Sequence, residues 1–147
     1  MWDDLIMKSL LVCATYGRIP YLSTMLSGFL HQTYDDKSLV IINDDTNVEL
    51  CCNHKNVMVI NCNRRILLSE KRNLGIASGY HDVIFPYDDD DVFLPNRVAN
   101  HIKQYSDPNI NAYRNIKNYV IYGDKFIVGG SFNQYTVGST KKIIRFN

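Results

Sequence analysis

Short apolar runs alternate along the first two thirds of the chain with segments whose apolar residues recur at helical spacing. Four runs are continuously apolar, as is typical of strands buried on both faces of a parallel sheet: residues 10–14, 39–42, 57–60 and 83–85. Helices are predicted to begin near Pro20, Ser69 and Pro95. This order of elements predicts an α/β fold with a mainly parallel sheet and helices on both of its faces.

The first two predicted helices each have one distinct face. In the first helix the apolar face comprises Leu22, Met25, Leu26, Phe29 and Leu30. The second helix is predicted to run from Ser69, a candidate N-cap, to Gly79, a residue that commonly ends helices. Its shared face would consist of Arg72, Ile76, Ala77 and Tyr80.

The third helix and the segment after it differ in character. The helix has Val98, His101, Ile102 and Tyr105 at helical spacing and is predicted to end at Asp107-Pro108, so His101 is expected to face the core. Beyond residue 110 the pattern changes to a β-hairpin, with strands at 119–122 and 125–128 around Gly123-Asp124. A polar, glycine-containing tail follows, for which no element is predicted.

Four consecutive aspartates occupy residues 88–91, between the fourth apolar run and the third helix. Clustered carboxylates repel one another, and a bound divalent cation removes that cost. Oxygen-only ligands suit Mg²⁺ or Mn²⁺, which usually complete their coordination with phosphate oxygens. A solvated acidic turn and a loose Ca²⁺ site are the alternatives. The flanking strand and helix favour the metal site, because they fix the cluster at the carboxyl edge of a sheet.

Composition excludes several classes of protein. The 147 residues are 46% hydrophobic, enough for one folded domain with a core, and the net charge of +1 gives no overall field that would recruit nucleic acid. The basic clusters at Arg64-Arg65 and Lys141-Lys142 are interpreted as ordinary solvated charge. No apolar run approaches the length of a membrane span, and we expect a cytoplasmic location.

The cysteines are expected to be reduced thiols. Cys13 lies in an apolar run and is predicted to be buried. A zinc site formed by Cys51, Cys52, His54 and Cys62 is disfavoured, because adjacent cysteines lack the usual two-residue gap and no second pair follows.

Polar clusters follow three of the four predicted strands, at residues 15–18, 43–45 and 88–91. Ligands of parallel α/β sheets bind at the carboxyl ends of the strands, so these clusters are predicted to form one site. Carboxylates with a metal suggest a nucleotide diphosphate, with Asp44 accepting hydrogen bonds from a base or ribose and Tyr16 stacking on a base. Lys71 and Arg72 would reach base or phosphate. For Tyr16 simple packing, and for the two cations a solvated helix face, are the alternatives.

Other nucleotide-binding motifs fit poorly. No Gly-x-Gly-x-x-Gly turn follows the first strand, and there is no phosphate loop ending in Gly-Lys-Ser/Thr. A phosphatase with an aspartate nucleophile is disfavoured, since Thr15 and Tyr16 occupy the end of the first strand.

These residues resemble, in order, the motifs of a family-2-like glycosyltransferase with the GT-A fold. Residues 11–18 resemble the opening strand and Pro-Thr-Tyr-Asn-Arg turn, with Ala14 and Gly17 in place of Pro and Asn. Residues 29–34 resemble the Gln-Thr-Tyr segment, 41–45 the Val-Val-Asp-Asp-Gly segment, and 71–76 the Arg-Asn-x-Gly helix. Residues 85–91, with Pro95 and Arg97, resemble the Leu-Asp-x-Asp-Asp-x-x-x-Pro-x-Arg signature. The resemblance covers roughly residues 9 to 115.

The resemblance implies a site for a nucleotide-diphosphate sugar, with a UDP-sugar favoured, and Mn²⁺ or Mg²⁺ as cofactor. The implied nucleotide-binding residues are Thr15, Tyr16, Arg18, Asn43, Asp44, Lys71, Arg72, Asn73, Asp88 and Asp89. The implied metal-binding residues are Asp90, as the direct ligand, together with Asp88 and Asp91. Residues 9–105 would bind the nucleotide sugar and metal, and residues 110–147 would be a short β-rich remnant of the acceptor side.

The expected activity is metal-dependent transfer of a sugar to an unknown acceptor. Family members of the inverting type use a carboxylate as general base, and no residue here is identified for that role, since Asp124 is a turn residue of the hairpin. A minimal natural enzyme, a fragment and one half of a split enzyme therefore remain open, with a homodimer or a partner chain expected. A nucleotide-sugar binding module and a nucleotidyltransferase are the alternative functions.

Overall fold

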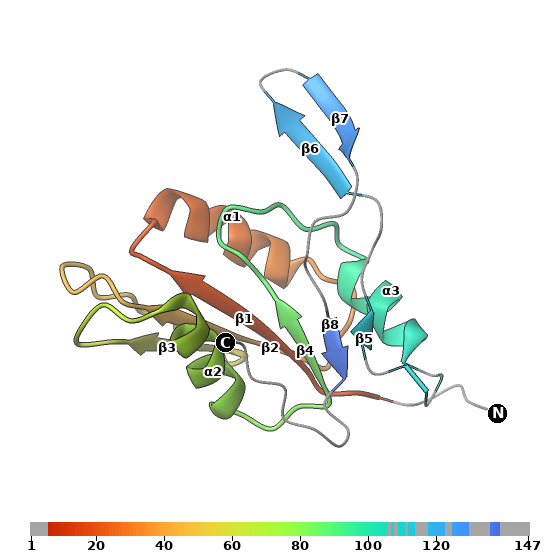
Figure 1. Cartoon of the computed structure of the whole chain (residues 1–147), viewed down its shortest axis with the longest axis horizontal. Helices are drawn as coiled ribbons and strands as arrows, with labels where there is room; N and C mark the ends of the chain where they lie inside the picture. Colours follow the sequence, from red (N-terminus) through yellow and green to blue (C-terminus); the bar gives the residue numbers. More distant parts are fainter. Residues whose placement is uncertain are drawn as a thin grey trace.

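The computed structural model describes residues 6–105, 107, 109–110 and 112–113, and the strands at 118–122, 125–129 and 136–138. Its main sheet has six strands in the order β3-β2-β1-β4-β8-β5 (Figure 1). The strands are β1 (Ser9–Thr15), β2 (Lys37–Asn43), β3 (Val57–Asn61), β4 (Val83–Pro86), β5 (Ala112–Tyr113) and β8 (Thr136–Gly138). The first four are parallel, and their positions confirm the four predicted strands.

The order of the strands has a switch point at β1, because the strands that follow it in sequence lie first on one side of β1 and then on the other. From β1 the chain proceeds to β2 and then β3 on one side, whereas β4 pairs with the other side of β1. Such a point leaves a crevice between the carboxyl ends of two strands whose connections run in opposite directions, and there α/β sheets bind ligands. The end of β1, at Thr15, and the residues following β4 therefore lie at the position that the fold favours for a site.

Two helices, α1 (Ile19–Leu30) and α3 (Arg97–Gln104), pack on one face of the sheet. The larger core cluster lies between them and the strands. Its helical members are Leu22, Met25, Phe29, Val98 and Ile102, and its strand members include Leu11, Cys13, Leu39, Ile41, Val83 and Phe85. His101 is 2% exposed and its ring lies beside those of Phe85 and Tyr113, which confirms the expectation that it faces the core. Leu30, expected on the apolar face of α1, is instead 46% exposed.

The opposite face of the sheet is covered by α2 (Leu68–Ala77), so helices lie on both faces as predicted. The alternate residues of β1 and β2 form a second core cluster with Ile76. Gly75 allows this close approach, because a Cβ atom there would lie 2.6 Å from Cγ1 of Val12 and 2.8 Å from Cδ1 of Ile42. Both faces of the central strands are therefore buried, which explains why their sequences are continuously apolar.

Two expectations for α2 were wrong. The helix begins at Leu68, with Leu67 rather than Ser69 as its N-cap, and the carboxylate of Glu70 accepts a 2.9 Å hydrogen bond from the amide of Leu67. Glu70, at the third helical position, thus satisfies the backbone amide of the N-cap residue itself. The buried face consists of Lys71, Gly75 and Ile76, whereas Ala77 is exposed and Tyr80 is 80% exposed beyond the helix end.

The later part of the chain contains the predicted hairpin and two strands that were not predicted. Strands β6 (Asn118–Tyr122) and β7 (Lys125–Gly129) pair antiparallel in a separate sheet, and the expected turn at 123–124 lies outside the described residues. β8, which arises from the tail, pairs antiparallel with both β4 and β5. The main sheet is thus parallel across its first four strands, and both pairings beyond β4 are antiparallel.

Candidate donor-binding site

The end of β1 is joined to the loop after β4 by a buried hydrogen bond. Thr15 is 2% exposed, and its hydroxyl donates to Oδ2 of Asp89 at 2.7 Å. The chain then turns at Gly17, whose φ of +58° is the left-handed conformation that glycine adopts at low cost. The Gly17 amide donates to Oδ1 of Asn43 at 3.0 Å, which links the β1 turn to the end of β2.

Arg18 binds two of the four aspartates. Its Nε donates to Oδ2 of Asp89 at 3.0 Å, its Nη2 contacts the other oxygen of Asp89, and its Nη1 donates to Oδ2 of Asp90 at 3.3 Å. The hydrogen bond with Asp89 raises the pKa of Arg18 above its ordinary value. Asp89 itself is 2% exposed, so its carboxylate is held inside the protein by Thr15 and Arg18.

Asp88 and Asp90 are accessible, in contrast to Asp89. Their side chains are 28% and 51% exposed, and Asp88 accepts a 3.3 Å hydrogen bond from Nη2 of Arg72 on α2. Asp91 is half-buried, and its amide donates to the Asp88 carbonyl at 3.4 Å. Within the described part of the chain, no three His, Cys, Asp or Glu side chains are grouped as ligands of one metal ion. Asp88 and Asp90 thus each lie beside an arginine, and both are reached by solvent.

Gln32, which is buried, and Arg97, which is partly buried, anchor the loop that carries the aspartates. Gln32, two residues beyond the end of α1, donates to the Leu94 carbonyl at 2.8 Å and accepts from the Val98 amide at 3.1 Å. The Arg97 guanidinium lies 4.0 Å from the Phe93 ring centroid and donates to the Pro86 carbonyl at 3.2 Å, and burial lowers its pKa to about 10. Both residues belong to segments that sequence reasoning singled out, but no role was predicted for either of them.

Asp44 and Lys71 form a buried ion pair beside the end of β1. Nζ of Lys71 lies 2.6 Å from Oδ1 of Asp44 and donates to the Thr15 carbonyl at 3.1 Å. Oδ2 of Asp44 accepts a 3.0 Å hydrogen bond from the Ile66 amide. Burial alone would raise the pKa of Asp44, but the hydrogen bonds from Lys71 and Ile66 and the nearby positive charge outweigh it and hold that pKa below its usual range.

Asn43 connects β2 to the turns around it. It is fully buried, and its Nδ2 donates to the Val48 carbonyl at 2.6 Å and to Oδ1 of Asn61 at 3.1 Å. Its Oδ1 accepts from the amides of Gly17 and Asp45. The described bonds of Asn43 are therefore with protein groups that shape the site, and its direct contact with a nucleotide stays a prediction.

The outer side of the site carries an aromatic ring and an arginine. Tyr16 is 41% exposed, and the guanidinium carbon of Arg65 lies 4.4 Å from the centroid of its ring. The sequence marks Arg65 only by its place in a short basic cluster, which is typical of ordinary solvated charge, whereas here its guanidinium lies over the Tyr16 ring. Asn73 is half-buried on α2, one residue beyond Arg72.

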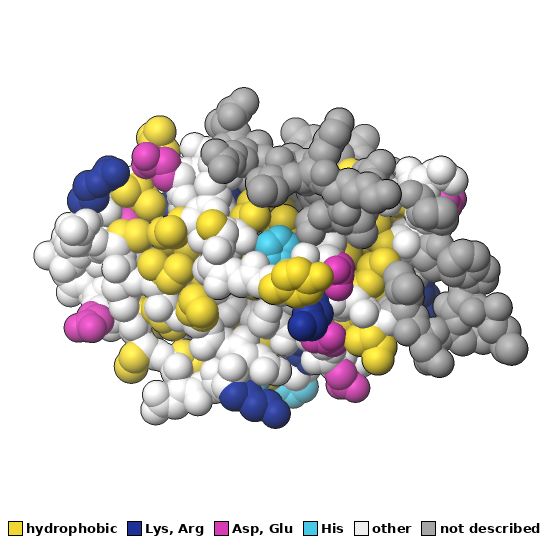
Figure 2. All heavy atoms as spheres, turned by 90° about the horizontal axis from the view of Figure 1, so that it is seen from below, with side chains coloured by type: hydrophobic (Ala, Val, Ile, Leu, Met, Phe, Trp, Pro, Cys, Tyr) yellow, Lys and Arg dark blue, Asp and Glu magenta, His cyan; other side chains and the backbone are white. Residues whose placement is uncertain are grey.

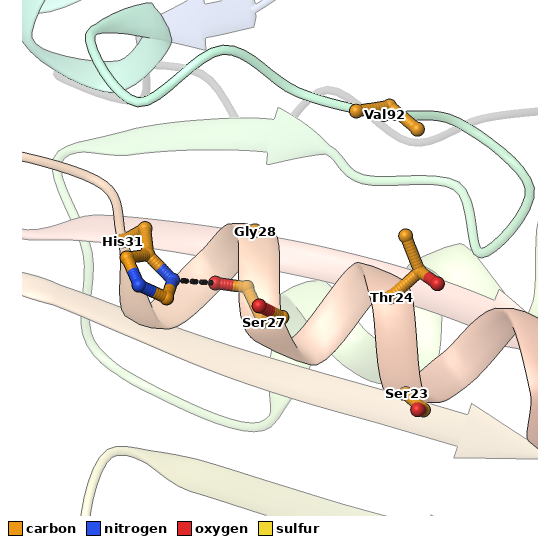
Figure 3. A pocket seen from close by; sticks show the side chains of 6 residues that line it. All are labelled: Ser23, Thr24, Ser27, Gly28, His31 and Val92. Atoms are coloured by element: carbon orange, nitrogen blue, oxygen red, sulfur yellow. Dashed lines mark hydrogen bonds between the residues drawn. The ribbon is translucent and has the colours of Figure 1, made fainter.

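A separate hollow of about 400 Å³ adjoins the aspartate loop, between the outer face of α1 and Val92 (Figure 3). Its lining is mainly small and polar, and consists of Ser23, Thr24, Ser27, Gly28, His31 and Val92. Nδ1 of His31 is hydrogen-bonded to the carbonyl of Ser27 at 2.8 Å. None of the residues predicted for the nucleotide or metal lines this hollow.

Thus the ends of β1, β2 and β4 do meet, together with two residues of α2. The structure connects Thr15, Arg18, Asp89 and Asp90 in one group, Asp88 with Arg72 in a second, and Asp44 with Lys71 in a third. On the face seen in Figure 2, basic and acidic side chains are interspersed with hydrophobic ones and do not gather in a patch of one sign. Among the described residues, no helix has the length and apolar character needed to cross a bilayer.

Residues 10–134 match the family model described as glycosyl transferase family 2. The chain belongs to glycosyltransferase family 2. Its similarity to the uncharacterized glycosyltransferase YwdF of Bacillus subtilis is 30% identity over 102 residues, which is 67% of this chain and 38% of YwdF. The chain therefore spans little more than a third of the curated relative that it matches.

Solved structures agree on the fold. The mannosyltransferase PcManGT from Pyrobaculum calidifontis, in complex with GDP-Man and Mn²⁺, superposes with a TM-score of 0.64 at 15% identity, over 76% of this chain and 37% of that one. Residues 1–349 of S. aureus TarS in complex with UDP superpose with a TM-score of 0.58 at 14% identity, over 72% and 34% of the two chains. The predicted GT-A-like α/β fold of a family 2 glycosyltransferase is confirmed.

Proposed function

We propose that the chain carries the donor-binding part of a metal-dependent glycosyltransferase that moves a sugar from a nucleotide-diphosphate donor to an acceptor. The observation that supports it best is the meeting of Asp88 and Asp90, both accessible, with two arginines at the switch point of the sheet. A diphosphate needs cations at this place, and membership of family 2 supplies the reaction class.

The residues present fit a divalent cation. Mg²⁺ and Mn²⁺ are commonly held by one or two carboxylates, with substrate phosphates and water as the other ligands. Asp90 and Asp88 would bind the ion, and Asp91 lies close enough in sequence to bind one of its waters. When bound, the metal would stabilise the negative charge that develops on the departing diphosphate. The Mn²⁺ in the PcManGT complex supports a metal of this type.

Arg18 and Arg72 would bind the diphosphate. In the structure each guanidinium contacts a carboxylate that we assign to the metal, at 3.3 Å in both cases. Once the metal neutralises those carboxylates, the arginines can donate to phosphate oxygens, which accept bidentate hydrogen bonds well. Arg18 would remain anchored through Asp89, so it would turn toward the ligand without leaving the site.

The nucleoside would occupy the β1–β2 side of the site, near Thr15, Tyr16 and the Asp44–Lys71 pair. The exposed Tyr16 ring offers a stacking surface, on which a base would replace the Arg65 guanidinium. We favour a UDP-sugar, in line with the UDP bound in the TarS complex, although the related fold of PcManGT holds GDP-Man. The acceptor is a compound with a free hydroxyl group, and we propose that its general base lies outside residues 6–105. A dimer or partner chain and a cytoplasmic location stay predictions.

The test has two parts. In the first, the melting temperature of the chain is measured with UDP, with Mn²⁺ and with both, because a ligand that binds the folded state raises it. We expect UDP to raise the melting temperature only when Mn²⁺ is present. If the melting temperature rises neither with UDP alone nor with UDP and Mn²⁺ together, the proposal is contradicted. In the second, a panel of sugar nucleotides is incubated with the chain and Mn²⁺. Release of the nucleoside diphosphate supports sugar transfer or donor hydrolysis, whereas pyrophosphate would indicate nucleotidyl transfer, and binding without products would indicate a binding module.

A further inference from the structure

The carboxylate of Asp44, expected from the sequence to contact the base, is already engaged on both oxygens. Oδ1 accepts from Nζ of Lys71 at 2.6 Å, and Oδ2 accepts from the amide of Ile66 at 3.0 Å. Asp44 is only 1% exposed. In this arrangement the carboxylate connects the end of β2 to α2, through Lys71, and to the segment before α2, through Ile66.

Lys71 still has a hydrogen-bond donor to offer. An ammonium group has three N–H bonds, and the described residues accept two of them, through Asp44 and the Thr15 carbonyl. Lys71 is 8% exposed, which is more than Asp44. A strongly hydrated ammonium with one unused donor is costly to bury, and a ligand oxygen would remove that cost.

The position of Lys71 indicates which part of a nucleotide it would meet. Its Nζ lies at the ends of β1 and β2, where it contacts the Thr15 carbonyl and the Asp44 carboxylate. Thr15 directly precedes Tyr16. Asp88 and Asp90, which we assign to the metal and diphosphate, follow β4 on the opposite side of β1. Lys71 is therefore on the nucleoside side of the site, and Arg72 is on the diphosphate side, where it contacts Asp88.

The backbone of α2 fixes this lysine in place. Gly75 lies one helical turn beyond Lys71 on the same buried face, and it lets the helix pack directly against Val12 and Ile42. From this position Nζ of Lys71 reaches the ends of β1 and β2. Its buried ion pair then restricts its remaining rotamers.

We propose that Lys71 is the specificity-determining residue for the base, donating a hydrogen bond to a carbonyl oxygen of a pyrimidine ring, and that Asp44 is a positioning residue that holds the ammonium. This inference rests on the proposed function. An ammonium is a donor only, so the site would select a base by its carbonyl oxygen, not by its ring N–H. Uracil offers two such oxygens, O2 and O4.

Thio-substituted nucleotides test this inference without altering the protein. In 2-thio-UDP and 4-thio-UDP one carbonyl oxygen is replaced by sulfur, a weak acceptor, while the ring N–H is kept. Dissociation constants of UDP and both analogues are measured by calorimetry in the presence of Mn²⁺. For the wild-type chain we expect one of the two analogues to bind about tenfold more weakly than UDP, as befits loss of a charged hydrogen bond.

Variants then test whether Lys71 causes the weaker binding of the thio analogue. Lys71→Met should bind UDP and both analogues equally within about twofold, because the donor that senses the oxygen is gone. The double variant Asp44→Leu/Lys71→Met removes the buried pair as a unit, so it serves if the single variant does not fold, and it should give the same result. Lys55→Met, at an exposed lysine outside the site, is the control and should retain the wild-type difference.

The outcomes separate this inference from the proposed function. Equal binding of all three nucleotides by the wild-type chain, or an analogue penalty that persists in Lys71→Met and in the double variant, would overturn the role of Lys71 while leaving UDP binding intact. Failure of the wild-type chain to bind UDP at all would overturn this inference and the choice of a UDP-sugar as donor, and failure to bind any nucleotide of the sugar-nucleotide panel would overturn the proposed function as well.

Discussion

The hydroxyl of Thr15 and the carboxylate of Asp89 are joined by a 2.7 Å hydrogen bond across 74 residues of sequence. This bond ties the end of β1 to the loop after β4, and it distinguishes the environment of Asp89 from that of its neighbours. Asp89 is buried and holds the scaffold, whereas Asp88 and Asp90 on either side of it are accessible. Chemically identical neighbours therefore have different environments, and the nucleotide contact predicted for Asp89 stays a prediction.

Asp89→Ala should destabilise the fold. It would leave the buried Thr15 hydroxyl without its acceptor and would remove the two-point contact with Arg18, for an expected loss of about 2–3 kcal/mol. The measurement is urea unfolding followed by circular dichroism. A loss below about 1 kcal/mol would show that the Thr15–Asp89 connection contributes little to stability.

Asp90→Ala should change metal-dependent binding while leaving the stability of the fold nearly unchanged. Its pair with Arg18 is half exposed, so the loss of stability should stay below about 1 kcal/mol. Binding of UDP, measured by calorimetry, should no longer improve when Mn²⁺ is added. Glu49→Ala, at an exposed acidic residue away from the site, is the matched control and should keep the metal response. An unchanged response to Mn²⁺ in Asp90→Ala would remove Asp90 from the metal site.

Gly75→Ala should destabilise the protein although alanine favours helices. Its Cβ would meet Cγ1 of Val12 at 2.6 Å and Cδ1 of Ile42 at 2.8 Å, and such overpacking costs about 1–3 kcal/mol. Because the displaced helix carries Lys71 and Arg72, UDP binding should weaken as well. Gly79→Ala is the control, since a Cβ there meets nothing within 4 Å, and its stability should stay within about 0.5 kcal/mol of wild type. Equal stability of the two variants would argue against tight packing of α2.

Acid should weaken the fold through Asp44. Its pKa is lower in the folded protein than in the unfolded chain, so its contribution to stability is present above about pH 4 and is lost as the pH falls through the folded pKa. The Asp44→Leu/Lys71→Met variant lacks this contribution. Its urea midpoint should therefore fall less than that of the wild type between pH 5 and pH 3. Parallel falls in the two proteins would assign the acid sensitivity to other carboxylates.

The central strands and their polar ends were predictable because local sequence determines them. Strands β1, β2 and β4 are covered on both faces, so their residues are continuously apolar, and each changes abruptly to polar residues where it leaves the sheet. Parallel strands have their carboxyl ends at one edge of the sheet. Thr15, Asp44 and Asp88 therefore lie in the same region. The order of motifs along the chain was enough to indicate the family.

The remaining features depend on contacts that leave little local trace. Lys71 and Asp44 are 27 residues apart, and each alone is indistinguishable from a residue of a polar site or a solvated face. The start of α2 was misplaced because its N-cap is Leu67, a residue type that rarely caps helices, and the amide of Leu67 is bonded by Glu70 three residues later. β8 contains only Thr136, Val137 and Gly138, too few residues for a period of two to show.

The position of β8 has a consequence for the order in which the protein can fold during synthesis. Residues 136–138 are made after every other strand of the main sheet, yet they pair between β4 and β5, with Val137 opposite both Ile84 and Ala112. A nascent chain that has reached β5 can pair β4 with β1 but leaves its other edge unsatisfied, and β5 has no place in the sheet. Unpaired edges promote association with other strands. The outer edge of β4 is therefore covered only after residues 136–138 have been made, and shortening the chain before Thr136 should expose that edge.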